Sequence, residues 1–219
     1  MTTIFITSSG TDIGKTYVSA LLIRQLRARG FPIRAIKPVV SGLDETTFPT
    51  SDPAAILAAL GEPVEYENAE DISRWRFTAA LSPDMAAARE GAEIDFAELV
   101  NHCKARQALH DPLLIEGVGG LMVPLDATHT VLDWMLALNG PAFAPLLVVG
   151  SYLGTISHTL TTLDVMARNR LTPRAIVVSE SLSEPVSLEE TVDTIARFAG
   201  VKVIALPRNG EPDLASLFL

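Results

Sequence analysis

Short apolar runs alternate along the whole chain with longer segments of helical periodicity. The run Leu146-Leu147-Val148-Val149 is apolar without interruption, as expected of a strand that is buried on both faces of a sheet. Between such runs, apolar residues recur at three- and four-residue spacing, which is typical of helices that pack one face on a core. The strands predicted in this way are Ile4–Thr7, Ile33–Lys37, Leu113–Glu116, Pro145–Gly150, Ala175–Val178 and Lys202–Leu206.

Glycine and proline mark the boundaries of several predicted helices. Because Gly30, Gly61 and Gly91 each follow a segment of helical periodicity, we expect a helix to end at each of them. In Ser51-Asp52-Pro53, Asp52 is expected to be the N-cap and Pro53 the first helical residue. The predicted helices are Lys15–Arg29, the segments that begin at Ser51 and at Ser82, Asp95–Leu109, Val131–Leu138, Thr155–Arg168 and Leu188–Ala199.

This alternation of strand and helix predicts an α/β fold with three layers. A mostly parallel central sheet would carry helices on both faces, since parallel strands need crossover connections. Residues 62–78 are the least regular stretch, and no internal repeat or linker divides the chain. We therefore expect a single domain over residues 1–219.

The composition narrows the classes of partner and compartment. The chain has 219 residues and a formal net charge of −9, which argues against nucleic acid or an anionic membrane as a partner. No apolar run in the sequence approaches the ~20 residues that a membrane span needs. Cys103 is the one cysteine, so no internal disulfide can form, and a reducing, cytoplasmic location is expected.

The residues after the first predicted strand carry the strongest chemical signal. The segment from Thr7 to Thr16 reads Thr-Ser-Ser-Gly-Thr-Asp-Ile-Gly-Lys-Thr and leads directly into a predicted helix. Gly14-Lys15-Thr16 in this position is typical of a phosphate-binding loop (P-loop), in which backbone N–H groups wrap a polyphosphate, the lysine reaches its outer phosphates and the hydroxyl binds Mg²⁺. The strict pattern has glycine where this chain has Ser9, and Gly10 follows one residue late. The loop predicts a nucleoside triphosphate as the ligand.

Three charged residues are expected near this loop, because ligands of parallel sheets bind at the carboxyl ends of the strands. Lys37 ends a predicted strand and is either a cation directed at the phosphates or a solvated strand end. Asp52 is either a Mg²⁺ ligand or only the cap of its helix. Glu116 ends another strand and precedes Gly117-Val118-Gly119-Gly120, whose glycines let the backbone approach a ligand closely. Glu116 is therefore a candidate metal-coordinating acid.

The segment Gly154-Thr155-Ile156-Ser157-His158 opens a predicted helix at a further strand end. The free N–H groups of such a helix start form an anion site, although an ordinary helix cap explains the same residues equally well. The four histidines show no spacing typical of metal ligands, and Cys103 has no partner cysteine. No zinc site is predicted.

Taken together, these segments resemble the dethiobiotin synthetases, a family of enzymes of biotin synthesis. The resemblance extends along nearly the whole chain in the same order, and the displaced glycine of the P-loop is similar to that of the family. The segments that carry it are Thr-Asp-Ile-Gly-Lys-Thr at 11–16, Ile-Lys-Pro-Val-Val-Ser-Gly at 36–42, Ser-Asp at 51–52, Ser-Pro at 82–83, Glu-Gly-Val-Gly-Gly at 116–120 and Val-Val-Gly-Ser-Tyr-Leu-Gly-Thr-Ile-Ser-His at 148–158.

The resemblance implies the fold of P-loop NTPases and an ATP- and Mg²⁺-dependent ring closure. One amine of 7,8-diaminopelargonate is carbamylated by CO₂, and the carbamate attacks the γ-phosphate of ATP. The second amine then closes the ureido ring and releases phosphate, which leaves dethiobiotin and ADP. The family also implies a homodimer with its substrate site near the interface.

The resemblance further implies a role for individual residues. Lys15 and Lys37 would be catalytic and hold the γ-phosphate and carbamate oxygens together, and Thr16, Asp52 and Glu116 would bind Mg²⁺. The implied nucleotide-binding residues are Asp12, Ile13, Gly14, Lys15, Thr16, Tyr17, Asp52, Glu116, Gly117, Val118, Gly119, Ser179, Pro207, Arg208 and Asn209. The implied substrate-binding residues are Thr11 and Ser41 at the reacting end, and Gly154, Thr155, Ile156 and Ser157 at the distal carboxylate.

Departures from the family pattern leave two questions open. Ser8 stands where the family often has glycine, so the geometry of the loop can differ slightly from that of the family. Ser179-Glu180 stands where the family commonly has Asn-Asp, so the base preference is not fixed.

One alternative to this family is another P-loop ATP-dependent ligase, related to the cobyrinate amidases, but such a protein would need room for a glutaminase domain. A second is a ParA- or MinD-like ATPase switch, which places an additional lysine early in the loop, where this chain has Ser8, Ser9 and Gly10.

Overall fold

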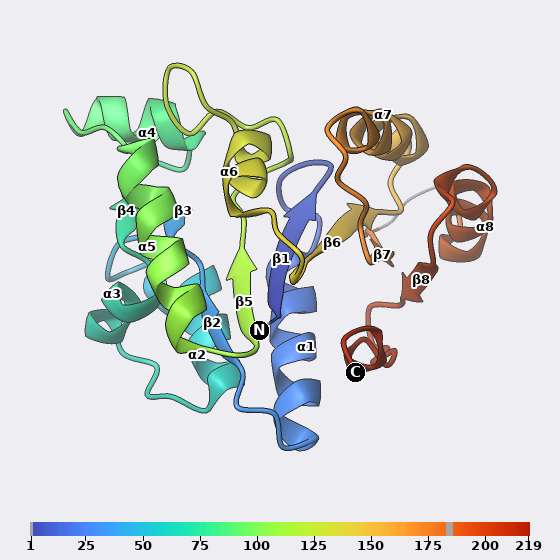
Figure 1. Cartoon of the computed structure of the whole chain (residues 1–219), viewed down its shortest axis with the longest axis horizontal. Helices are drawn as coiled ribbons and strands as arrows, with labels where there is room; N and C mark the ends of the chain where they lie inside the picture. The colour runs from blue at the N-terminus through green and yellow to red at the C-terminus, as the bar shows by residue number, and fades with distance from the viewer. Residues whose placement is uncertain (1, 183–185) are drawn as a thin grey trace.

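Six parallel strands form the central sheet of the computed structural model, which describes residues 2–182 and 186–219 (Figure 1). Every neighbouring pair of strands in this sheet runs parallel. All the strands predicted from the sequence are present in it, so the expected α/β class is confirmed. In spatial order the strands are β2 (Arg34–Ile36), β5 (Leu113–Glu116), β1 (Thr3–Ser8), β6 (Phe143–Gly150), β7 (Ala175–Ser179) and β8 (Val203–Leu206).

Helices cover both faces of this sheet, as the three-layer prediction requires (Figure 1). One face packs against α1 (Lys15–Ala28), α2 (Asp52–Leu60) and the 3-10 turn η3 (Ala215–Leu217). The opposite face packs against α5 (Phe96–Leu109), α6 (Val131–Leu138), α7 (Thr155–Arg168) and α8 (Leu188–Ala199). The shorter elements are α3 (Ala69–Ile72), α4 (Pro83–Arg89), η1 (Phe48–Thr50) and η2 (Tyr66–Asn68).

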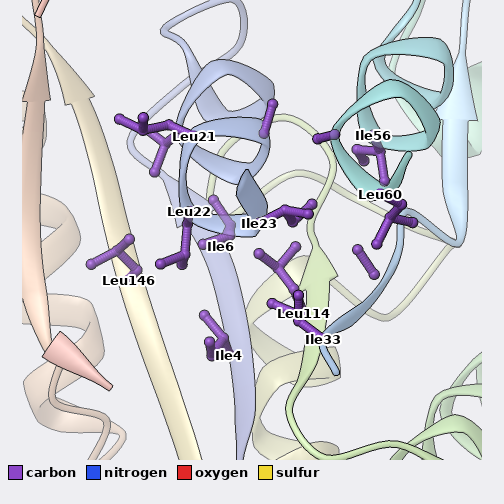
Figure 2. Close-up of a cluster of buried hydrophobic side chains, with 14 of the residues drawn as sticks. Ile4, Ile6, Leu21, Leu22, Ile23, Ile33, Ile56, Leu60, Leu114 and Leu146 are labelled. Atoms are coloured by element: carbon purple, nitrogen blue, oxygen red, sulfur yellow. The ribbon is translucent and has the colours of Figure 1, made fainter. Parts of the chain in front are cut away.

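The strands are apolar without interruption because each face of the sheet has its own core. In β1, Ile4 and Ile6 point to the core beneath α1 and α2, and Phe5 points to the opposite core, where its ring lies edge-on to Trp134. Figure 2 shows the first of these cores, in which Leu22 of α1 and Ile56 of α2 lie over the strand side chains. Strand β1 is therefore buried on both faces, and it lies between β5 and β6 in the sheet.

The stretch that looked least regular in sequence, residues 62–78, contains a short strand that was not predicted. This strand, β4 (Trp75–Phe77), pairs in parallel with β3 (Val39–Ser41) in a separate two-stranded sheet. Strand β2 ends at Ile36, before Pro38, and the chain becomes extended again directly after that proline. Strands β3 and β4 have three residues each and, unlike β2, were not part of a longer segment with a strand pattern, so the sequence analysis missed them.

Candidate active site

A cavity of about 630 Å³ opens at the carboxyl ends of the strands, where the fold class leads us to expect a ligand. Most of its walls come from residues that the sequence singled out. These are Thr11, Asp12, Ile13, Gly14, Lys15, Thr16, Tyr17, Lys37, Ser41, Asp52, Val118 and Gly119, and they are joined by Val40, Val123 and the run from Ala80 to Pro83.

The loop between β1 and α1 has the geometry of a phosphate site. Gly14 caps α1 with a left-handed backbone (φ 97°), and no side chain caps the first N–H groups of the helix. A Cβ on Gly14 would lie 2.7 Å from Oγ of Ser179, so both the backbone angle and the close approach of β7 require glycine here. The uncapped N–H groups at this helix start suit a phosphate.

Lys37 lies at the centre of an ionic network and is not a solvated strand end. Its side chain is only 3% exposed, and Nζ donates to Glu116 Oε1 at 2.6 Å and lies 2.8 Å from Asp52 Oδ2. Glu116 itself is fully buried. Thr16 Oγ1 lies 2.6 Å from Asp52 Oδ1 and 2.8 Å from Glu116 Oε1. Four residues from four separate segments of the chain therefore meet at one point beside the P-loop.

The pKa values of the two lysines in the cavity are shifted in opposite directions. Burial by itself lowers the pKa of Lys37, but the charges of Glu116 and Asp52 outweigh it and raise the pKa well above the ordinary lysine value. Burial, followed by the charge of Lys37, lowers the pKa of Lys15 to about 8. The hydrogen-bond partners of Lys15 Nζ are uncharged oxygens, Ser8 Oγ at 3.2 Å and Gly10 O at 3.5 Å. Lys15 therefore has room for an anionic partner, which a nucleotide phosphate can supply.

The oxygen atoms beside Lys37 fit a Mg²⁺ ion. Glu116 Oε2 is buried and accepts no hydrogen bond, and the single proton of Thr16 faces two carboxylate oxygens. Mg²⁺ at phosphate sites takes one or two carboxylates and completes its shell with hydroxyl, water and phosphate oxygens. In the described parts of the chain, no group of three or more His, Cys, Asp or Glu side chains is arranged to hold a metal ion by itself.

The prediction that Asp52 caps its helix is wrong. Ser51 is the N-cap of α2, with its Oγ accepting from Ala54 N at 3.4 Å, and Asp52 is the first helical residue. Serine and aspartate are about equally good caps, so the sequence pattern could not separate them. Because Ser51 caps the helix, the Asp52 carboxylate is available to Lys37 and Thr16. Burial raises the pKa of Asp52, but the charge of Lys37 and the hydrogen bonds from Lys37 and Thr16 together outweigh it and lower that pKa.

A second cavity, of about 500 Å³, adjoins the first across the P-loop. Four residues line both cavities: Asp12, Ile13 and Gly14 of the P-loop, and Tyr17 of α1. The rest of the second cavity comes from the ends of β7 and β8, at residues 179–182 and 206–208. Glu180 Oε2 accepts from Arg208 N at 2.8 Å and so joins these two strand ends. Of the residues expected to bind the nucleotide here, Ser179, Pro207 and Arg208 line the cavity and Asn209 does not.

Two other groups of expected site residues line neither cavity. The segment Gly154–Ser157 lines neither of them, and Thr155 is buried with Oγ1 donating to Gly150 O at 2.7 Å. Gly117 packs beneath the site, where an added Cβ would lie 3.1 Å from the ring of Phe5. Within one copy of the chain, the start of α7 therefore does not face the P-loop cavity.

Some cavity residues were not assigned from the sequence. Ala80, Leu81, Ser82 and Pro83 line the first cavity because they follow β4, the strand that the pattern missed. The signal that could have found them was the Ser-Pro pair at 82–83, which belongs to the family resemblance. Glu180 lines the second cavity and was recognised only as a departure from the family pattern.

Comparison with known proteins finds several relatives that share the same name. A family model described as "AAA domain" matches residues 2–211. The chain is 48% identical to the ATP-dependent dethiobiotin synthetase BioD of Methylobacterium nodulans over 96% of its length and 95% of that protein. It is 45% identical to the protein of the same name from Acidiphilium cryptum, with 91% and 89% covered, and 42% identical to that of Caulobacter vibrioides, with 99% and 97% covered.

Solved structures similar to this one share its fold at low sequence identity. MinD of Pyrococcus furiosus is 18% identical with a TM-score of 0.55, and the match covers 95% of this chain and 84% of that one. A ParA family ATPase of Chlorobium tepidum is 12% identical with a TM-score of 0.56, covering 99% and 89%. These likenesses show a P-loop NTPase fold and carry no information on activity.

Proposed function

Since the chain belongs to the dethiobiotin synthetase family and is an ATP-dependent ligase that forms dethiobiotin, we propose that the P-loop cavity is where it closes the ureido ring. The observation that carries this proposal is the position of Lys37, a buried cation that shares two carboxylates with Thr16 of the P-loop. Such a network lies where an attacking oxygen and a γ-phosphate would have to meet.

The chemistry needs positioning and neutralisation of charge more than it needs a strong base. One amine of 7,8-diaminopelargonate adds to CO₂ and loses a proton, which gives a carbamate. A carbamate oxygen then bonds to the γ-phosphorus of ATP as the bond to ADP breaks. Attack of the second amine on the carbamate carbon closes the ring and expels phosphate.

Each part of the cavity has a role in this sequence. The N–H groups at the start of α1 and the Lys15 ammonium would hold the phosphates, and Lys37 would hold a carbamate oxygen against the γ-phosphate. Thr16, Asp52 and Glu116 would hold Mg²⁺, which when bound neutralises phosphate charge. Ser41 Oγ is buried without a hydrogen-bond partner in the wall of the cavity, which suits a bond to the amine or the carbamate. Thr11 would contact the same end of the substrate.

The nucleoside part of ATP would occupy the second cavity. Ser179, Pro207 and Arg208 line it, and Asn209 follows directly in the same strand-end loop. Ser179 Oγ points towards Gly14, so the hydroxyl supports the P-loop as well as the wall of the cavity.

The distal carboxylate of the substrate would bind at the start of α7 in a second copy of the chain. Gly154–Ser157 would receive it there, because within one copy this helix start lines neither cavity. The proposal therefore requires a homodimer. It also places the enzyme in the cytoplasm, where its single, buried cysteine stays reduced.

A direct assay tests the assignment. Purified protein with 7,8-diaminopelargonate, bicarbonate, ATP and Mg²⁺ should give dethiobiotin and ADP in equal amounts. Omission of the diamine should abolish ADP release, whereas an ATPase switch would still hydrolyse ATP. Folded, nucleotide-binding protein that forms no dethiobiotin would refute the proposal.

A further inference from the structure

Ser8, the last residue of β1, lies where the P-loop meets the loop that follows β5. Its side chain is fully buried, and its backbone oxygen accepts a hydrogen bond from Leu121 N at 2.9 Å. A Cβ on Gly120 would lie 3.0 Å from Gly10 N, so the two loops are in tight contact. They form one packed unit around Ser8.

The Ser8 hydroxyl has more acceptors around it than it has protons. Oγ lies 2.7 Å from Gly10 O in the P-loop and 2.7 Å from Gly119 O in the neighbouring loop. A hydroxyl has one proton, so it donates to one of these carbonyls at a time. Its remaining lone pairs accept a hydrogen bond from Lys15 Nζ at 3.2 Å. The side chain thus joins Lys15 to both loops.

Lys15 depends more on its hydrogen bond to Ser8 than Lys37 depends on any single one of its contacts. Over residues 2–182 and 186–219, the hydrogen bonds of Lys15 Nζ are those to Ser8 Oγ and, at 3.5 Å, to Gly10 O. Lys37 Nζ is instead bonded to two carboxylates. A lysine side chain gains considerable rotamer freedom when its polar contacts are lost. Loss of the Ser8 hydroxyl would therefore release the Lys15 ammonium.

We propose that Ser8 is a positioning residue for the reaction: its hydroxyl holds Lys15 where the ammonium meets the transferred phosphate. The inference rests on the proposed function, because it takes the P-loop cavity to be the ATP site. The backbone N–H groups of the loop hold the nucleotide whether or not Lys15 is well placed. A displaced Lys15 therefore lowers kcat and the preference for a triphosphate, while affinity for ADP is kept.

The test compares Ser8→Ala with Ser19→Ala in the full-length protein. Ser19 is buried in α1 and its hydroxyl has no hydrogen-bond partner, so it is a matched control for removal of a buried hydroxyl. Calorimetry gives the affinities for ADP and for a non-hydrolysable ATP analogue, and the dethiobiotin assay gives kcat. Ser8→Cys keeps the size of the side chain with a much weaker hydrogen-bonding group, and serves if the alanine variant does not fold.

For Ser8→Ala we expect kcat to fall about tenfold. The ratio of the affinity for the ATP analogue to the affinity for ADP should fall about threefold. The affinity for ADP and the melting temperature should stay close to those of Ser19→Ala. Unchanged kcat and an unchanged affinity ratio would overturn the proposal. So would a parallel loss of ADP affinity, stability and kcat, which would show a purely structural role. The affinity ratio is readable even if the wild-type protein makes no dethiobiotin, so failure of the proposed function is a separate result.

Discussion

Lys37 is the residue on which the proposed chemistry depends most. It is buried in a cavity wall, yet its charge is maintained because Glu116 and Asp52 lie within 2.8 Å of Nζ. Breaking a buried ion pair by removal of one partner leaves an uncompensated charge and typically costs about 3–5 kcal/mol. Lys37 therefore contributes to stability as well as to chemistry, and an experiment has to separate the two.

Replacing Lys37 by Gln should lower kcat by about 10²-fold or more while ADP affinity changes only a few-fold, since the cation acts on the transferred group. Kinetics and calorimetry measure the two effects. The melting temperature should fall without Mg²⁺ and recover in part with Mg²⁺ and ADP, because a bound cation again neutralises Glu116. Equal losses of turnover and nucleotide affinity would show that Lys37 is only a binding residue.

Ser51 and Asp52 are neighbours with separable roles, and this gives a matched pair of variants. Ser51→Ala removes the cap of α2 and should cost about 1 kcal/mol, or a few degrees of melting temperature, with an unchanged Mg²⁺ requirement. Asp52→Asn should instead raise the Mg²⁺ concentration needed for half-maximal activity, with the cap intact. Thermal melts and Mg²⁺ titrations of the assay distinguish them. If Asp52→Asn lowered only the melting temperature and Ser51→Ala raised the Mg²⁺ requirement, Asp52 would instead be the helix cap.

The turn between β1 and α1 shows how an element junction sets the geometry of the site. Gly14 and Gly30 flank the same helix, and both have positive φ, 97° and 83°. They differ in their surroundings, because an added Cβ at Gly14 meets Ser179 and one at Gly30 has open space. The strain of the backbone angle is thus common to both positions, and the steric conflict is confined to the P-loop.

Gly14→Ala should therefore reduce ATP affinity by about tenfold or more, because the loop must move away from β7 to relieve the clash. Gly30→Ala has the same backbone penalty of about 1–2 kcal/mol and should lower only the melting temperature. Calorimetric titration with ATP gives the comparison. Equal ATP affinity in the two variants would contradict the packing of Ser179 on Gly14.

Elements with a clear helical or apolar pattern could be predicted from the sequence, and the short strands β3 and β4 could not. Helices α6, α7 and α8 begin and end where the periodicity indicated, because burial of one face over several turns leaves a clear pattern. Strands β3 and β4 are three residues long and left none. In the site, the rule of strand ends located Lys37 and Glu116 correctly. The same rule could not tell that the start of α7 lies outside the cavities, since that depends on the spatial order of the strands.

At the scale of the whole molecule, the functional residues follow the order of strands in the sheet. The ends of β2, β5 and β1 carry Lys37, Glu116 and the P-loop, and the ends of β7 and β8 carry the second cavity. No helix within residues 2–182 and 186–219 is long and apolar enough to cross a bilayer. All these contacts lie within one copy of the chain, so the homodimer is an expectation that the fold does not test.

Mixing two inactive variants tests whether each active site of a homodimer takes residues from both copies of the chain. Lys37→Gln disables the reacting end, and Ser157→Glu places a negative charge at the exposed start of α7, where it would repel a carboxylate. After dissociation and reassembly at equal amounts, about a quarter of wild-type activity should return, because half of the dimers are mixed and one of their two sites is intact. Each variant alone should stay inactive. No recovery in a protein of dimeric mass would refute the shared site.

Strand β6 separates the strands whose ends carry the two cavities. This strand lies between β1, which carries the P-loop, and β7, which begins the second cavity, and its own end lines neither cavity. With strands about 4.8 Å apart, the axes of β1 and β7 lie roughly 10 Å from each other. The P-loop crosses that distance, because Gly14 packs against Ser179 at the end of β7. On the proposed assignment of the two cavities, a ligand that fills both would extend along the P-loop from one to the other, and a whole nucleotide would be favoured over a free triphosphate or a free base.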